Sequence, residues 1–267
     1  MIGVPVRPAP VRTAPTGGAP VLLATSHGTS DPAGQRAVLA LVDAVAAAAP
    51  ELTVRGGYVD VQSPDVPTCL TSIAADAANR PVVIVPLLLS AGYHVRVDLA
   101  EAAAEAGQPV RVTGALGPDP RLARILADRL QEIDLQPADT VVLAAAGSTD
   151  ANAVADCHAV GGQLAAVLGR AVTVGFISAA EPRLADAVLT ARAGASGRVV
   201  VATYLLAPGY FAGLAENCGA DAVSRPLLVD GGAPPRQLVD VVLDLYASAS
   251  RLEQALAGLP WSFSSRS

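Results

Sequence analysis

The fold is set by residues 21–31, VLLATSHGTSD, in which a short apolar run ends in a glycine-containing polar turn. The run at 21–25 predicts a buried strand. The hydroxyls of Thr29 and Ser30 and the carboxylate of Asp31 are typical of residues that cap a helix N-terminus. A strand that leads through a short turn into a helix begins a strand–helix–strand unit, and such units build parallel sheets.

The same alternation of β-branched runs and Ala/Leu-rich amphipathic stretches continues along the chain. Strands are expected at 21–25, 53–59, 81–88, 110–113, 140–145, 171–177, 198–204 and 222–226. Helices are expected at 34–49, 65–78, 95–106, 119–131, 151–168, 182–193, 211–218 and 235–257. This order of elements predicts an α/β fold with parallel sheets.

Three segments recur in the same order in the two halves of the chain. Their offsets are 119, 118 and 117 residues, for GTSD at 28–31 and GSTD at 147–150, GYV at 57–59 and GFI at 175–177, and LLSAGY at 88–93 and LLAPGY at 205–210. Three ordered matches with nearly constant offsets are hard to obtain by chance in two unrelated halves. We therefore expect an internal duplication.

The duplication predicts two lobes joined by a linker at 133–139. The N-terminal lobe is expected to span 20–134 and to carry the functional site, and a degenerate C-terminal lobe is expected to span 138–258. The segments 1–19 and 259–267 are expected to be disordered tails. The first of them is rich in proline and has no continuous apolar stretch, which argues against a secretory signal.

Composition argues against several classes of protein. Hydrophobic residues make up 52% and charged residues 16% of the chain, which indicates a large core. Acidic residues outnumber basic ones by 24 to 18, and basic clusters are missing, so no nucleic-acid partner is expected. The longest strongly apolar run, at 81–92, is shorter than the roughly 20 residues of a membrane-spanning helix. We expect a cytoplasmic protein with no membrane partner.

Two kinds of cofactor chemistry are also disfavoured. All 18 basic residues are Arg, and a phosphate-binding P-loop requires Lys, so an ATP-driven activity is not expected. The three cysteines, Cys69, Cys157 and Cys218, lie far apart and form no CxxC pair. They therefore support neither a zinc nor an iron–sulfur site.

Two histidines distinguish the first half from the second. His27 aligns with Ala146, and His94 aligns with Phe211. Both histidines follow expected strands, whose carboxyl ends gather at one edge of a parallel sheet, where α/β proteins bind ligands. Asp60 leaves the second strand at the same edge. Two imidazoles and a carboxylate in one cleft can bind a divalent metal or accept protons near neutral pH.

Each of these residues also fits a plainer role. His27 has the position of a helix cap or loop hydrogen-bonding residue, His94 that of a surface residue at a helix start, and Asp60 that of a turn residue. His158 lies within an expected helix, has no partner in view and is expected to be solvated. The pattern alone does not decide between the functional and the plainer roles.

Taken together, the segments resemble a known family, the small class II chelatases that metallate sirohydrochlorin. The resemblance is carried by LATSHGTSD at 23–31, GYVD at 57–60 with Pro64, and VPLLLSAGYHVRVD at 85–98. It extends over residues 20–257 and includes the degenerate second copy. It implies two flavodoxin-like lobes of parallel sheet, with the tetrapyrrole bound in the cleft between them.

The resemblance also implies roles for individual residues. His27 and His94 would bind the incoming metal and assist proton removal. Asp60 stands where many members of the family carry Glu, and its shorter side chain weakens the case for a metal contact. The substrate carries carboxylates that need donors, and the candidates are Ser26, Gly28, Thr29, Ser30, Tyr93, Arg36 and Arg96.

The activity that the resemblance implies is ATP-independent insertion of Fe²⁺ into sirohydrochlorin in sirohaem biosynthesis. Cobalt insertion for cobalamin biosynthesis is the close alternative, because nitrogen and oxygen ligands do not select iron over cobalt. A non-catalytic tetrapyrrole or metal carrier, or a flavodoxin-like small-molecule-binding protein, would also fit these residues. The divalent metal is expected as a substrate, with no permanently bound cofactor, and the chain is expected to be a monomer or a weak homodimer.

Overall fold

The computed structural model describes residues 18–76, 80–90 and 92–257, and for 93–96 and 252–257 it describes the backbone only. Most of the expected tail at 1–19 and all of that at 259–267 lie outside the described residues. No helix in this part of the chain is long and apolar enough to cross a membrane.

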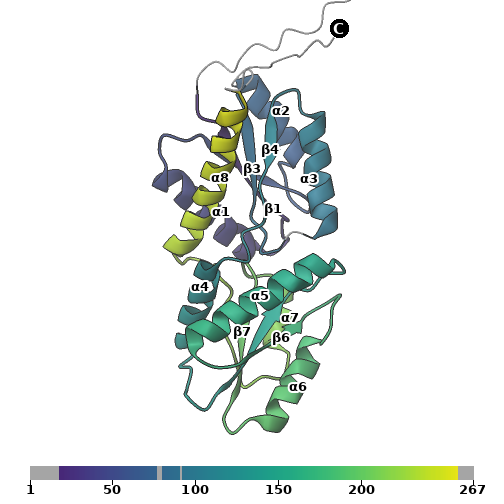
Figure 1. The fold of residues 1–267 in the computed structure, drawn as a ribbon, viewed down its shortest axis with the longest axis vertical. Helices are drawn as coiled ribbons and strands as arrows, with labels where there is room; N and C mark the ends of the chain where they lie inside the picture. The colour runs from purple at the N-terminus through teal and green to yellow at the C-terminus, as the bar shows by residue number, and fades with distance from the viewer. Residues whose placement is uncertain (1–17, 77–79, 91, 258–267) are drawn as a thin grey trace, which may run out of the picture.

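Strands and helices alternate along the described residues, as the sequence predicts (Figure 1). The strands are β1 (Val21–Ser26), β2 (Val54–Tyr58), β3 (Val82–Pro86), β4 (Val110–Val112), β5 (Thr140–Ala145), β6 (Val172–Phe176), β7 (Val199–Tyr204) and β8 (Ala222–Val223). The helices are α1 (Pro32–Ala48), α2 (Val66–Asp76), α3 (Tyr93–Glu105), α4 (Pro120–Gln131), α5 (Ala151–Leu168), α6 (Leu184–Gly194), α7 (Tyr210–Glu216) and α8 (Arg236–Ala257).

Strand β8 is shorter than expected, since it ends at Val223 rather than near residue 226. The backbone N–H of Ser224 still donates to the carbonyl of Val201, at 2.8 Å. The N–H of Thr203, however, donates to the Ser224 hydroxyl, at 3.0 Å. Because a side chain takes the place of a backbone carbonyl, the regular ladder stops there.

The strands form two separate parallel sheets of four strands each, in the orders β2-β1-β3-β4 and β6-β5-β7-β8. The first strand of each repeat, β1 or β5, is therefore central and is almost fully buried. The order reverses between β1 and β3 and between β5 and β7. In open α/β sheets, ligands bind in the crevice that forms at the carboxyl ends of the strands at such a reversal.

The two sheets reproduce each other in local detail, which confirms the duplication. Gly28 and Gly147 both adopt positive φ, 94° and 91°. A Cβ at either position would overlap a backbone carbonyl oxygen, that of Asp60 or of Ser178, so only glycine fits. In both turns an Asp then caps the following helix, at α1 and at α5.

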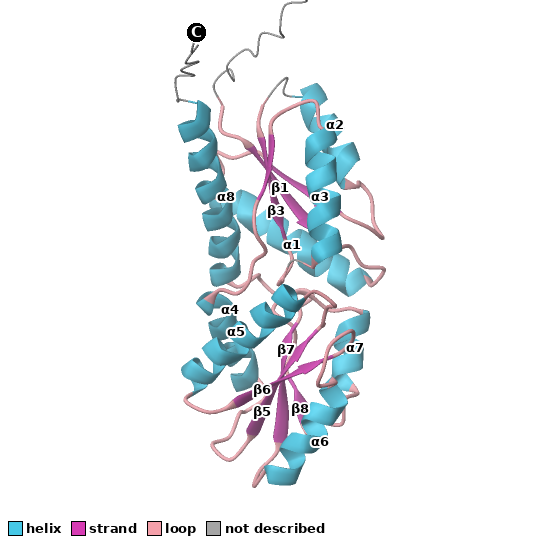
Figure 2. Ribbon diagram, turned by 45° about the vertical axis from the view of Figure 1, so that its right-hand side comes forward, coloured by secondary structure: helices cyan, strands magenta, loops and turns pink. Residues whose placement is uncertain are grey.

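The last helix of each repeat packs on the other repeat's sheet. Helix α4 lies against α5 and β7, and helix α8 lies against β3 and α1. Figures 1 and 2 show α8 alongside the first sheet and α4 alongside α5. The Tyr246 hydroxyl on α8 donates to the carbonyl of Pro20, at 2.7 Å. The repeats that we expected at 20–134 and 138–258 thus differ from the lobes in space by one helix each.

This exchange produces a core that runs through both lobes. One buried cluster includes Leu22 of β1, Leu126 of α4, Leu143 of β5 and Val242 of α8, none of them exposed to solvent. Two smaller clusters lie under α2 and α6, on the outer faces of the sheets. The lobes are consequently held together by apolar packing, which is the dominant favourable contribution to folding.

Candidate functional site

A cavity of about 480 Å³ lies between the two lobes. The first lobe contributes residues 26–30, 38, 61–62 and 87–90, and the second contributes 145–147, 157 and 204–212. The carboxyl ends of both central strands, β1 and β5, therefore open into the same space. Its volume is within the range of 300–1,000 Å³ that is usual for small-molecule sites.

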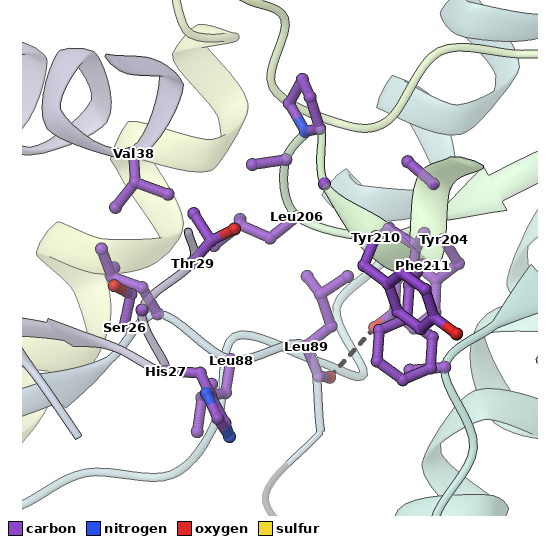
Figure 3. Close-up of a pocket in the computed structure, with 18 of the residues that line it drawn as sticks. Ser26, His27, Thr29, Val38, Leu88, Leu89, Tyr204, Leu206, Tyr210 and Phe211 are labelled. Atoms are coloured by element: carbon purple, nitrogen blue, oxygen red, sulfur yellow. Dashed lines mark hydrogen bonds between the residues drawn. The ribbon is translucent and has the colours of Figure 1, made fainter. Parts of the chain in front are cut away.

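His27 is exposed at the first-lobe side of this cavity (Figure 3). Its backbone is held firmly, because its carbonyl accepts the N–H of Asp60 at 3.0 Å and Gly28 follows in a conformation that only glycine adopts easily. Within the described residues, no group hydrogen-bonds to its imidazole. The ring is therefore available to a ligand, which fits the ligand role better than that of a helix cap.

Ser26 places a buried hydroxyl at the cavity wall. The residue is 5% exposed, and its Oγ has no hydrogen-bond partner among the described residues. The neighbouring Thr25 has the same property but does not line the cavity. Leaving a buried hydroxyl unpaired costs about 1–3 kcal/mol, so such a group calls for an explanation. For Ser26 the explanation is its place at the cavity, where a polar group of a bound ligand can hydrogen-bond to the hydroxyl.

Thr29 shapes the turn. Its Oγ1 accepts the N–H of Asp31 at 3.1 Å, and its own N–H donates to the side-chain Oε1 of Gln62 at 2.9 Å. Gln62, which also lines the cavity, was not singled out from the sequence. The only signal was its place two residues after Asp60, in the loop that leaves β2. Ser30 is exposed at the mouth of the cavity.

Asp60 is joined to His27 by a backbone hydrogen bond but does not line the cavity. Its side chain is exposed, and Oδ1 accepts the N–H of Val61 at 2.7 Å. This geometry is that of a turn residue, the plainer of the two roles that the sequence allows. Among the described residues, no group of three or more His, Cys, Asp or Glu side chains is placed to hold a metal ion.

His94 lies in the first turn of α3, after the loop at 87–90 that lines the cavity. The side chains of Tyr93, His94 and Arg96 lie outside the described residues. The backbone nearby is close to the second lobe, because a Cβ at Gly92 would be 3.6 Å from the Ser148 hydroxyl. The start of α3 is therefore beside the space between the lobes.

The second lobe supplies an apolar wall. The Tyr204 hydroxyl donates to the carbonyl of Leu89 across the lobes, at 3.1 Å, and burial raises the pKa of that phenol. Burial, followed by the nearby Asp156 carboxylate, raises the pKa of Cys157 to about 11, so its thiol is protonated at neutral pH. Tyr210 and Phe211 are exposed here.

The described residues that line the cavity include no Asp, Glu, Lys or Arg, and His27 is the one histidine among them. Arg36, a candidate carboxylate donor, does not line the cavity. It forms an ion pair with Asp230, with Nη2 to Oδ2 at 2.6 Å, across the lobe boundary. In the structure its guanidinium therefore faces Asp230 rather than the cavity, and a contact with the substrate stays a prediction.

Comparisons with known proteins give one consistent result. The CbiX family model matches residues 21–133 and 140–213. No curated protein matches the chain.

Solved structures share this fold. SirB from Bacillus subtilis with Fe³⁺ has a TM-score of 0.74 at 18% identity, covering 89% of this chain and 98% of SirB. SirB from Bacillus subtilis subspecies spizizenii in complex with cobalt has a TM-score of 0.68 at 17% identity, covering 89% and 97%. DR2241 from Deinococcus radiodurans, a multi-domain protein with structural similarity to chelatases, has a TM-score of 0.58 at 23% identity, covering 86% of this chain and 55% of DR2241.

Proposed function

The chain belongs to the CbiX family, and from that premise we propose that it is a sirohydrochlorin chelatase, which inserts Fe²⁺ into sirohydrochlorin to form sirohaem without ATP. One observation carries the proposal. A cavity at the carboxyl ends of both central strands has the exposed imidazole of His27 in it, at a position where the second repeat carries Ala146.

The reaction requires two changes. The metal must lose bound water, and two pyrrole N–H protons must leave the macrocycle as the metal–nitrogen bonds form. A neutral imidazole can act as a ligand that replaces water or as a base that accepts a proton. In the proposal His27 and His94 share these tasks. Asp60 is a weaker third candidate, because the Val61 N–H already holds one of its oxygens.

The walls of the cavity suit a flat and largely apolar ring. Leucines at 87–89 and 205–206 and the aromatic side chains of the second lobe offer apolar surface on both sides. The substrate's carboxylates would then extend to the rim, where Ser30 is exposed and where the turn at 28–30 leads into α1. Arg96 and Tyr93 remain candidate donors on α3, and the Ser26 hydroxyl is a candidate donor within the cavity.

The identity of the inserted metal has a close alternative. One SirB structure contains Fe³⁺ and the other contains cobalt, so chelatases of this fold hold either element. Insertion of Co²⁺ into sirohydrochlorin is therefore the second candidate. The imidazole ligands do not discriminate between the two ions, and the metal supply of the cell contributes to the outcome.

The test is an anaerobic assay in which purified protein, sirohydrochlorin and Fe²⁺ or Co²⁺ are mixed and the absorption spectrum is followed. We expect several turnovers per protein molecule with at least one of the metals. No acceleration over the protein-free control with either metal would overturn the proposal. Uptake that stops at one equivalent per protein would indicate a carrier instead.

Substitution of His27 sharpens this test. We expect His27→Ala to lower the insertion rate at least tenfold while the melting temperature stays unchanged, because the side chain is exposed. His158→Ala is the matched control, since this exposed histidine on α5 does not line the cavity. Equal rates for the two variants would remove His27 from the reaction. His94→Ala is expected to behave as His27→Ala does.

A further inference from the structure

Exposed aromatic surface is concentrated at the cavity between the lobes. Tyr210 is 76% exposed and Phe211 is 39% exposed, and both line the cavity. Aromatic residues make up only 3% of the chain, and these two are the exposed ones among the described residues. The other exposed large apolar side chains in the described part of the chain are Leu39, Val61, Val167, Leu189 and Leu214, of which only Val61 lines the cavity.

The two rings project from the first two residues of α7. They contact each other edge to face, with centroids 5.8 Å apart and planes at 77°, which restrains both. The start of α7 is close to the first lobe, because a Cβ at Gly209 would be 3.4 Å from the Thr29 hydroxyl. Figure 3 shows Tyr210 and Phe211 on the other side of the view from His27, with Leu89 between them in that view.

The duplication shows what has changed at this position. Tyr210-Phe211 in the second repeat corresponds to Tyr93-His94 in the first. The second repeat has replaced an imidazole, which can ligate a metal or accept a proton, by a phenyl ring, which can do neither. A flat apolar face remains. The position has therefore lost the acid–base chemistry of its counterpart and kept a ring.

We propose that Tyr210 and Phe211 form a stacking surface that binds one side of the planar, conjugated macrocycle and positions it for the imidazole of His27. This inference rests on the proposed function, since it names how the same cavity holds its substrate. The two repeats then divide the work: the first supplies metal and proton chemistry, and the second supplies ring binding. The described lining has no Asp, Glu, Lys or Arg side chain, so contact with the ring face is one means by which these residues hold the ligand.

The experiment measures binding separately from insertion. Metal-free sirohydrochlorin is titrated into the full-length protein, and its absorption bands report the dissociation constant. We expect the double variant Tyr210→Leu/Phe211→Leu to raise that constant at least tenfold and each single variant to raise it about threefold or more. In the insertion assay the double variant should raise KM and leave kcat within about threefold.

Three further variants test the role of the rings. Tyr210→Phe and Phe211→Tyr keep an aromatic face, so each should bind within about twofold of the wild-type protein. Leu214→Ala is the matched control, because Leu214 is 41% exposed on the same helix but does not line the cavity. His27→Ala should leave metal-free binding within about threefold although it slows insertion. The melting temperatures should stay close to that of the wild-type protein.

The outcomes separate this inference from the function on which it rests. If the wild-type protein binds and metallates sirohydrochlorin while the double leucine variant binds it equally well, the stacking role is wrong and the chelatase proposal stands. If the wild-type protein binds no sirohydrochlorin, both fail. A rise in the dissociation constant that Leu214→Ala reproduces would also overturn the stacking role.

Discussion

Three consecutive side chains at the end of β1 distinguish the two copies of the repeat. Residues 25–27 are Thr-Ser-His, whereas residues 144–146, at the corresponding end of β5, are all Ala. The two strands pair with their neighbours in the same order and direction. The fold therefore tolerates alanine at these positions. The hydroxyls and the imidazole are not needed to build the sheet, and in our proposal the Ser26 hydroxyl and the His27 imidazole contact the ligand.

Ser26→Ala tests this assignment. Because the hydroxyl is buried without a described partner, we expect its removal to leave the free energy of unfolding unchanged or to raise it by up to about 1 kcal/mol. Metal-free sirohydrochlorin should bind about three- to tenfold more weakly. Denaturant unfolding and absorption titration measure the two effects.

Thr203→Val is the contrasting variant at this scale. The Thr203 hydroxyl is also buried, but it donates to the carbonyl of Ser224 at 2.7 Å. Its loss should cost about 1–3 kcal/mol because the carbonyl is left unpaired. If Ser26→Ala were as destabilising as Thr203→Val, the Ser26 hydroxyl would have a structural partner, and its role at the cavity would be wrong.

At the scale of elements, the start of α1 packs closely against the second lobe beside the cavity. A Cβ at Gly34, in the first turn of α1, would overlap the carbonyl oxygen of Pro208 in the loop after β7. Pro208 lines the cavity, so this contact sets the distance between the first helix of one lobe and a wall contributed by the other. A glycine here serves close packing rather than an unusual backbone angle.

We expect Gly34→Ala to destabilise the protein by about 1–3 kcal/mol, because the overlap with Pro208 outweighs the better helix propensity of alanine. It should also weaken sirohydrochlorin binding, since the cavity wall has to move. Gly162→Ala on α5 is the matched control, as nothing lies within 4 Å of its Cβ position. That variant should stabilise by about 0.4–1 kcal/mol. Thermal and denaturant unfolding measure the stability of both variants. Equal changes in the free energy of unfolding would contradict the proposed close contact.

At the scale of the whole molecule, the exchange of α4 and α8 makes each lobe depend on the other. Unfolding of the first lobe removes the surface on which α8 packs, and unfolding of the second lobe removes the surface on which α4 packs. The shared apolar cluster contains residues of both sheets and of both exchanged helices. We therefore expect one cooperative unfolding transition for the described part of the chain.

Tyr246→Ala tests that expectation. The side chain is 5% exposed on α8, and it bonds to Pro20 at the start of the first lobe. Its removal should cost about 3–5 kcal/mol, as for other large buried aromatic residues. Hydrogen exchange should show equal losses of protection in β1 and β5. Protection lost in β1 alone would mean that the lobes unfold independently. The exposed Val167→Ala on α5 should stay within about 0.5 kcal/mol of the wild-type protein.

Much of this molecule follows from local sequence pattern. The alternation of short β-branched runs with amphipathic stretches predicted the order of strands and helices. This was possible because strands and helices differ in the spacing of their hydrophobic residues, and that spacing can be read within a few residues. The matched segments predicted the duplication. The rule that ligands meet the carboxyl ends of parallel strands then placed His27 at an open edge, where the structure has it lining a cavity.

Other features depended on contacts between residues that are far apart in the chain. The exchange of α4 and α8 pairs each helix with the sheet of the other repeat, and the amphipathic face of a helix does not specify which sheet will cover it. The ion pair of Arg36 with Asp230, the bond from Thr29 to Gln62 and the exposure of Tyr210 and Phe211 are likewise invisible to a local pattern. Periodicity records which face of an element is buried, whereas only the packed structure determines which surfaces meet and which polar groups remain for a ligand.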